Sequence, residues 1–306
     1  KVAIFHKVWW LDAVSDGNWE VINLCDANGT VCALPFVRKN TRGLKLITQP
    51  PLTQFLGPVL RENGASNFKR LTEQKLVLEE LLHNLPKADI YRQNWSPCTS
   101  NLYPALFNGY STNLRYTYRL STSESIENIW KNFSSSTRRQ IRKATKCNLQ
   151  TTSKISIDDF IQQNQEVYLR QKMSVPYELR LIRSLSSALD LNQSLNIIAA
   201  TDPNNNIHAS LYFINDRQSV YYLMGGSHPQ YRNSGATSLC MYEGIKLAKK
   251  KELEFDFEGS MIPSIEKFFR GFGGQPKEYY GITRGFNFRS KFALNALNFI
   301  SDIIQK

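Results

Sequence analysis

One stretch of the sequence, residues 231–274, constrains the fold more than any other. A helical pattern over residues 236–251 places small side chains one turn apart, and such a face packs closely against a sheet. Residues 253–258 then alternate apolar and acidic side chains, which is the period of a half-buried strand. The stretch therefore predicts a loop, a helix, a strand and a second short helix within a mixed α/β fold.

The loop that begins this stretch is a candidate binding site for an anionic ligand. It lies where a hydrophobic strand ends and a helical pattern begins, so unpaired backbone N–H groups can receive a phosphate or a carbonyl oxygen. The ligand-binding candidates are seven consecutive residues: Tyr231, Arg232, Asn233, Ser234, Gly235, Ala236 and Thr237.

Two acidic residues of the predicted strand are candidates for proton transfer. Asp256 and Glu258 are two residues apart, so both side chains lie on the same face of a strand. Either carboxylate could accept a proton, directly or through a water molecule. The alternative is that they form structural ion pairs with Arg232 or Arg270, and the sequence leaves both interpretations open.

Composition limits the class of protein. The 306 residues, 42% of them apolar, favour two globular domains, and the net charge of +12 favours a polyanionic partner such as RNA, a nucleotide-linked precursor or an anionic membrane face. The five cysteines include no C-x-x-C pair, so we expect neither a metal site nor a disulfide framework. With no apolar run long enough to span a membrane and no signal peptide, we expect a cytoplasmic protein with at most a peripheral membrane contact.

The first half of the chain reads as β-β-β-α-β-β. Asn28-Gly29 between two β-rich runs predicts a hairpin. Residues 49–61 contain three prolines and are expected to cross the surface as an extended loop, with the lining of a cleft as the alternative. The expected strands and helix, in chain order, are residues 19–26, 31–38, 44–48, 73–85 (the helix), 88–95 and 114–120.

The second half opens with a cationic stretch. Five side chains share or border one helical face: Arg138, Arg139, Arg142, Lys143 and Lys146. This face either binds the phosphates of RNA or of a pyrophosphate, or is simply solvated. Helices are expected over residues 157–172 and 177–191, and three antiparallel strands over 195–201, 207–214 and 219–225.

The resulting order, β-α-α-β-β-β-α-β-α-β, is that of a Gcn5-related N-acetyltransferase (GNAT). The first half echoes it, and the motifs SSSTRRQIRKA and FDFEGSMIPSIEKFFRGFGG resemble those of the Fem-type peptidoglycan-bridge aminoacyltransferases. The resemblance implies tandem GNAT-like domains, each with a central, mostly antiparallel sheet flanked by helices. We expect them at residues 1–120 and 121–287, with a C-terminal helix over 288–306 packing back on the first domain.

The resemblance also implies an activity. Fem-type enzymes transfer an aminoacyl group from a charged tRNA to an amine of a peptidoglycan precursor, which is nucleotide- or lipid-linked, and they need no tightly bound cofactor. Residues 231–237 then form the donor loop. Arg270 stands where such enzymes place a lysine at the reacting centre, which adds it to Asp256 and Glu258 as a catalytic candidate. The substrate-binding candidates are Lys172, which matches a basic residue that contacts precursor phosphate, together with Tyr222 and Phe269.

Two alternatives stay open at this point. One is an N-acyltransferase of the same fold that uses an acyl-CoA donor. The donor loop YRNSGA has only one of the glycines of the usual acetyltransferase pyrophosphate loop, which favours tRNA over coenzyme A. The other is a non-catalytic relative that binds RNA or an anionic glycan through the basic face.

Overall fold

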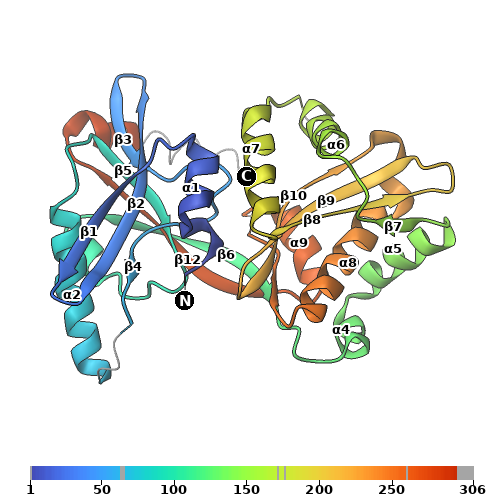
Figure 1. The fold of residues 1–306 in the computed structure, drawn as a ribbon, viewed down its shortest axis with the longest axis horizontal. Helices are drawn as coiled ribbons and strands as arrows, with labels where there is room; N and C mark the ends of the chain where they lie inside the picture. Colours follow the sequence, from blue (N-terminus) through green and yellow to red (C-terminus); the bar gives the residue numbers. More distant parts are fainter. Residues whose placement is uncertain (1, 63–65, 171, 176, 260, 295–306) are drawn as a thin grey trace. The chain divides into compact units, whose positions relative to one another are not determined.

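The computed structural model describes residues 2–62, 66–170, 172–175, 177–259 and 261–294 (Figure 1). The chain forms two compact units: unit 1 comprises Lys1–Arg115 and Glu278–Lys306, and unit 2 comprises Tyr116–Lys277. The chain enters unit 2 within strand β6 (Ser111–Leu120) and leaves it within β12 (Gln275–Gly285). Sequence analysis placed these boundaries at residues 120 and 287, because a strand shared by two units carries no change in composition.

Unit 1 is built on a mixed sheet in which most neighbours are antiparallel. β1 pairs with β2, β2 with β3, and β5 with β12, all antiparallel, whereas β3 and β5 are parallel. The hairpin at Asn28-Gly29 is confirmed, since Asp26 lies opposite Gly29. The elements are η1 (Ile4–His6), α1 (Val8–Ser15), β1 (Glu20–Asp26), β2 (Gly29–Thr41), β3 (Leu44–Thr48), β4 (Val59–Leu60), α2 (Asn67–His83), β5 (Ile90–Trp95) and α3 (Tyr103–Phe107).

Residues 49–61 correct one expectation, because they do not simply cross the surface. Phe55 and Leu56 are 1% and 0% exposed, and Leu56 pairs with Trp95 beyond the end of the β3–β5 ladder. Gly57 has φ 80°, and a Cβ atom there would lie 2.7 Å from the Trp95 ring. The segment therefore fills the end of the sheet, and its last residues line a cavity.

Unit 2 follows the predicted order of elements. β6 pairs antiparallel with β11, β11 parallel with β10, and β10, β9, β8 and β7 pair antiparallel in succession. The mixed α/β class is thereby confirmed. The elements are α4 (Ile126–Asn132), α5 (Ser135–Lys146), β7 (Gln150–Thr152), α6 (Ile157–Arg170), α7 (Leu179–Leu191), β8 (Leu195–Thr201), β9 (Ile207–Asn215), β10 (Ser219–Ser227), η2 (Pro229–Ser234), α8 (Ala236–Lys250), β11 (Glu254–Asp256) and α9 (Pro263–Gly271).

Helices cover both faces of the unit 2 sheet. Tyr212 points to one face, where its ring lies 5.2 Å from that of Phe160 in α6. The next residue, Phe213, points to the other face and packs against α8, where a side chain at Gly244 would collide with the phenyl ring. The small residues predicted along α8 therefore allow close contact with the sheet.

The expected C-terminal helix is described only in part. Residues 288–294 are helical, and residues 295–306 lie outside the described part of the chain. Asn287 begins this helix, because its side-chain oxygen accepts a hydrogen bond from the Ser290 backbone at 2.8 Å. Its amide donates to Asp89 at 2.6 Å, which attaches the helix to unit 1.

Candidate active site

Two parallel strands of the unit 2 sheet separate at one end. β10 pairs with β11 over three residues, a ladder that ends at Tyr221 and Asp256. β10 continues to Ser227 and pairs there with β9, while the chain turns out of β11 at Glu258, which has φ 53°. Beyond Tyr221, β10 therefore has no partner from β11, and Tyr222 and Glu258 follow directly after the point of separation.

The predicted donor loop, residues 231–237, spans the end of the 3₁₀ helix η2 and the first residues of α8. Gly235 joins the two with φ 83°, a conformation that glycine adopts without strain. A Cβ atom at Gly235 would collide with the carbonyl oxygen of Gln140, so this glycine also allows the loop to contact the backbone of α5. Arg232 and Asn233 are exposed at this position. The loop thus combines an exposed polar edge with close packing on the basic helix.

The other residues of the loop hold it in place. Tyr231 stacks on His208 with ring centroids 4.0 Å apart and an interplanar angle of 6°. The Ser234 hydroxyl accepts a hydrogen bond from the Ala236 backbone at 3.3 Å, which occupies one of the N–H groups expected to receive a ligand. Ala236 is buried and Thr237 is half-buried.

Asp256 is fully buried and well partnered. It accepts hydrogen bonds from Thr117, from Arg119 Nε at 2.9 Å and from the Glu258 backbone at 2.9 Å. Burial raises its pKa, and these donors oppose that shift by favouring the carboxylate. The structural interpretation of Asp256 therefore fits better than the catalytic one, although its partner is Arg119 rather than Arg232 or Arg270.

Glu258 differs from Asp256 in both burial and hydrogen bonding, since its side chain is half-buried. Its Oε1 atom is shielded from solvent and makes no hydrogen bond among the described residues. Burial, with a smaller contribution from the charge of Asp256, raises the pKa of Glu258 well above its usual value. The pKa of the Tyr222 hydroxyl is raised mainly by burial, then by Tyr168 and by the charge of Glu258. Glu258 and Tyr222 therefore lie within electrostatic range of each other. A carboxylate with a raised pKa accepts a proton more readily than an ordinary glutamate does.

Arg270 lies on α9 and is open to solvent. Its side chain is 64% exposed, and its Nε atom is 2.8 Å from Glu266 Oε1. Tyr118 donates its hydroxyl proton to the same oxygen at 3.1 Å, and the hydrogen bond from Arg270 lowers the pKa of Glu266. Phe269, predicted to bind substrate, is 3% exposed and packs on the rings of Phe257 and Tyr222, so it belongs to the core.

The cationic stretch forms α5 as a regular helix with an exposed basic face. The side chains of Arg139, Arg142, Lys143 and Lys146 are exposed, whereas Arg138 donates to the carbonyl oxygens of Lys131 and Phe133 at 2.7 Å. Arg138 therefore closes the end of α4 rather than facing a ligand. Lys172 follows α6 and is exposed, with φ 55°.

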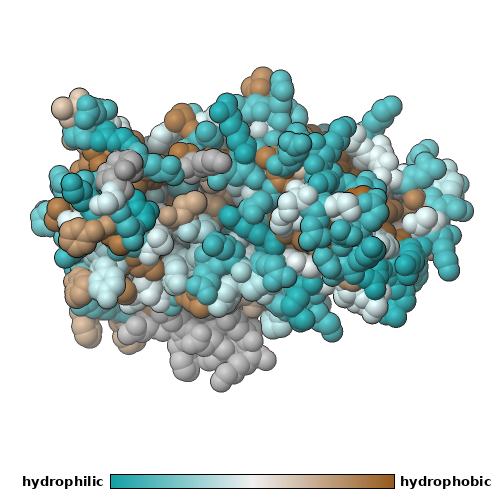
Figure 2. Space-filling model, turned by 90° about the horizontal axis from the view of Figure 1, so that it is seen from below, coloured by the Kyte–Doolittle hydropathy of each residue, from teal (hydrophilic) through white to brown (hydrophobic). Residues whose placement is uncertain are grey.

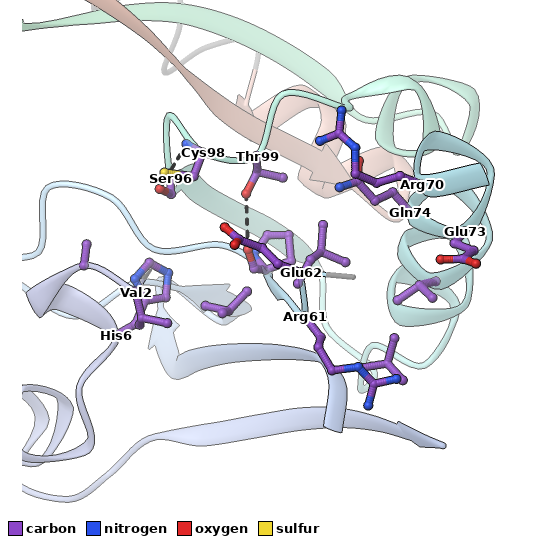
Figure 3. Close-up of a pocket in the computed structure, with 16 residues that line it drawn as sticks. Val2, His6, Arg61, Glu62, Arg70, Glu73, Gln74, Ser96, Cys98 and Thr99 are labelled. Atoms are coloured by element: carbon purple, nitrogen blue, oxygen red, sulfur yellow. Dashed lines mark hydrogen bonds between the residues drawn. The ribbon is translucent and has the colours of Figure 1, made fainter. Parts of the chain in front are cut away.

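Unit 1 contains a cavity of about 380 Å³ that includes none of the predicted site residues. Arg70 and Gln74 project from α2 at one end, and His6 lies at the other (Figure 3). Burial lowers the pKa of His6 to about 4, and hydrogen bonding to the backbone of Leu56 and Gly57 opposes that shift only in part. This imidazole is therefore neutral at physiological pH.

Within residues 2–62, 66–170, 172–175, 177–259 and 261–294, no group of three or more His, Cys, Asp or Glu side chains is arranged to hold a metal ion. No helix in the described part of the chain is both long enough and apolar enough to cross a membrane.

Comparison with known proteins finds a family match within unit 2. Residues 131–264 match the family described as Acetyltransferase (GNAT) domain, a range that includes α5, the donor loop and the separated strands. The chain is an acyltransferase with a GNAT domain. No curated protein sequence matches it.

Solved structures extend the similarity to both units of this acyltransferase. The crystal structure of FemX covers 90% of the chain and 91% of its own length, with a TM-score of 0.68 and 10% identity. The structure of L-PGS from Bacillus licheniformis covers 92% and 88%, with a TM-score of 0.55 and 12% identity. A domain assigned to a lysylphosphatidylglycerol synthetase from Agrobacterium fabrum covers 94% and 90%, with a TM-score of 0.54 and 11% identity. The predicted resemblance to Fem-type enzymes is thus confirmed at the level of the fold.

The sequence did not reveal the residues that bind the Asp256 carboxylate and so distinguish it from Glu258. Thr117 and Arg119 come from β6, more than 130 residues before Asp256, and they satisfy its carboxylate. Alternation of polar and apolar residues in the LRYTYRL strand was visible, but its pairing with β11 was not. Glu258 was found, although on a left-handed turn rather than on the strand.

Proposed function

We propose that this acyltransferase moves an aminoacyl group from aminoacyl-tRNA to an amine of a peptidoglycan precursor. The observation that carries the proposal is the contact between the donor loop and α5, whose exposed face bears four cations. From Arg139 to Lys146 these cations extend over roughly 10 Å, at about 1.5 Å per residue. A row of this length suits a chain of phosphates better than a single pyrophosphate. The fold shared with FemX agrees with this donor.

The reaction requires an amine to attack the ester carbonyl of the donor. A C–N bond forms, the C–O bond to the tRNA ribose breaks, and the proton of the amine ends on the ribose oxygen. We assign proton uptake and return to Glu258, because its pKa is raised by burial and its shielded Oε1 atom makes no hydrogen bond among the described residues. Arg270 cannot exchange a proton, and its exposed guanidinium instead balances the oxyanion or holds the tRNA end.

The test measures which donor gives up its label. Purified protein is incubated with tRNA charged with radiolabelled amino acids and, in parallel, with labelled acetyl-CoA, each with nucleotide-linked and lipid-linked muramyl peptides. We expect transfer from tRNA only, and a loss of at least about 100-fold in Glu258→Gln, the usual contribution of a general base. Transfer from acetyl-CoA alone would favour the acyl-CoA enzyme. Transfer from neither donor would contradict the proposal and favour a binding protein.

The role of α5 has its own matched control. Arg139→Gln combined with Lys143→Gln should raise the KM for charged tRNA and reduce its salt dependence, by roughly 0.7–0.9 in the logarithmic slope per lost phosphate contact. Lys250 and Lys251 are also exposed but lie at the other end of α8, about 20 Å from the donor loop at 1.5 Å per residue. Replacing both by Gln should leave the KM for tRNA unchanged.

A further inference from the structure

Exposed aromatic side chains are confined to one of the two units. Among the described residues all six belong to unit 1, and we call this set the aromatic face: Phe68, Tyr103, Phe107, Phe286, Phe288 and Phe292. In unit 2 the exposed large apolar side chains are aliphatic or methionine. Figure 2 shows hydrophobic side chains reaching the surface among hydrophilic ones. A concentration of exposed aromatics on one unit marks a surface that binds something apolar.

Two short helices each expose an aromatic pair at positions i and i+4, which lie on the same side of a helix. In α3 the pair is Tyr103 and Phe107, 64% and 73% exposed, with ring centroids 5.3 Å apart. In residues 288–294 the pair is Phe288 and Phe292, 87% and 70% exposed. Neither pair is covered by the described part of unit 1.

The remaining members of the face connect to α3. On α2, Phe68 is 81% exposed and Leu71, one turn later, is 40% exposed. The Leu71 carbonyl accepts a hydrogen bond from Asn101, just before α3, at 3.4 Å. At the other end of α3, a Cβ atom on Gly109 would lie 4.0 Å from Arg284, whose guanidinium is 5.0 Å from the Phe286 ring centroid. These contacts make α2, α3 and the end of β12 neighbours within unit 1, and the helix that carries Phe288 and Phe292 follows β12 directly.

The charges around the aromatic face are predominantly positive. Arg284 lies between the rings of Tyr110 and Phe286, at 5.1 and 5.0 Å from their centroids. Arg289 and Lys291 flank Phe288 and are exposed. Neither α3 nor residues 286–294 contain an acidic residue. The nearby carboxylates are Asp89, which accepts a hydrogen bond from Asn287, and Glu73 in α2, where Lys69 and Arg70 flank Phe68 and Leu71. A partner for this surface must therefore accept aromatic rings and carry negative charge.

We propose that the aromatic face docks unit 1 on an anionic lipid bilayer. Phenylalanine and tyrosine partition into the boundary between headgroups and acyl chains, and arginine and lysine bind the anionic headgroups beside them. The net charge of +12 acts in the same direction. Docking itself is independent of the acyl donor. Where the proposed function holds, it brings the enzyme to a lipid-linked acceptor.

The experiment measures flotation of the full chain with vesicles, so it requires no catalysis. One set contains equal parts of phosphatidylglycerol and phosphatidylcholine, and the other contains phosphatidylcholine alone. The test variant is Phe107→Ser, Phe288→Ser and Phe292→Ser, all at exposed positions. The matched control is Leu169→Ser with Leu191→Ser in unit 2, where the side chains are 70% and 86% exposed. Circular dichroism and thermal unfolding verify that each variant is folded.

We expect the protein to float with the anionic vesicles and not with phosphatidylcholine alone. The triple variant should bind at least tenfold more weakly, the control within twofold of the unaltered protein, and high salt should weaken binding. Equal binding by the triple variant, equal losses in both variants, or no binding to the anionic vesicles would overturn the proposal. A dimer that the triple variant converts to a monomer, without vesicle binding, would assign the face to a second copy of the chain.

Discussion

The Glu258→Gln variant should be more stable than the unaltered protein, and this difference in the free energy of unfolding should grow as the pH rises. The carboxyl is shielded, has no hydrogen bond to its Oε1 atom and has a pKa raised by burial. At a pH below the unfolded-state pKa of about 4.3, the group is protonated in both states and does not affect the balance. Above that pH the unfolded chain is ionised while the folded protein keeps its proton. The unaltered protein therefore loses stability until the pH passes the folded-state pKa.

The size of the effect follows from proton linkage. Between the two pKa values, the free energy of unfolding of the unaltered protein should fall by about 1.4 kcal/mol per pH unit relative to Glu258→Gln. Two pH units above 4.3 would give a difference of about 2.7 kcal/mol, which is large beside a typical total of about 5–15 kcal/mol. At pH 4 the two proteins should agree within about 1 kcal/mol, since an amide and a neutral carboxyl group are similarly costly to bury.

Urea unfolding at pH 4, 5, 6 and 7 measures this difference directly. Glu252→Gln is the control, because its side chain is exposed six residues earlier in the same segment. The control should follow the unaltered protein at every pH. A constant offset between Glu258→Gln and the unaltered protein across this range would refute the reasoning, since it would mean that the carboxyl ionises as freely in the folded state as in the unfolded chain.

Three further outcomes are expected. Asp256→Asn should destabilise the protein by about 2–3 kcal/mol in urea unfolding. This is less than the roughly 3–5 kcal/mol typical of a fully buried ion pair, because the Arg119 side chain is 25% exposed. An unchanged free energy of unfolding would contradict a stabilising ion pair. Gly235→Ala should reduce the melting temperature through strain at φ 83° and the collision with α5, whereas Gly17→Ala, with φ 74° and no neighbour within 4 Å, should cost only about 1 kcal/mol. Trp95→Phe should disturb the packing of residues 49–57, which limited proteolysis would detect as new cleavage there.

Local patterns predicted most of the elements of unit 2. Strand β8 has the predicted bounds, and the small residues of α8 were assigned correctly to a close helix–sheet contact. In unit 1 the helices η1 and α1 were missed, because VWWLDAVS is only eight residues long and carries no capping residue. α2 begins six residues before its predicted start, since its first turn, Asn67–Arg70, is helical although its one apolar side chain, Phe68, is exposed.

Pairing between distant segments could not be predicted. Alternation in residues 253–258 indicated a regular strand with its acids on one face, but the strand stops at Asp256. The chain then turns at Glu258 because the Asp256 carboxylate accepts its backbone N–H. That bond depends on Asp256 being fixed by Thr117 and Arg119 from β6, a contact that no local pattern contains. The same long-range contact gives Asp256 its structural partners, whereas Glu258 Oε1 makes no hydrogen bond among the described residues.

The end of the parallel strand pair differs between the two units, which supports our proposal that the donor site belongs to unit 2. Each has a parallel pair joined through a helix, β3 and β5 through α2, and β10 and β11 through α8. In unit 1 the chain turns back after β3, so that Leu56 pairs with Trp95 and the Gln49 side chain accepts the Asn94 N–H at 2.7 Å. In unit 2 the chain passes from β10 directly into η2. The backbone of β10 beyond Tyr221 is thereby left without a partner from β11, and this is the position from which a strand can bind an extended donor.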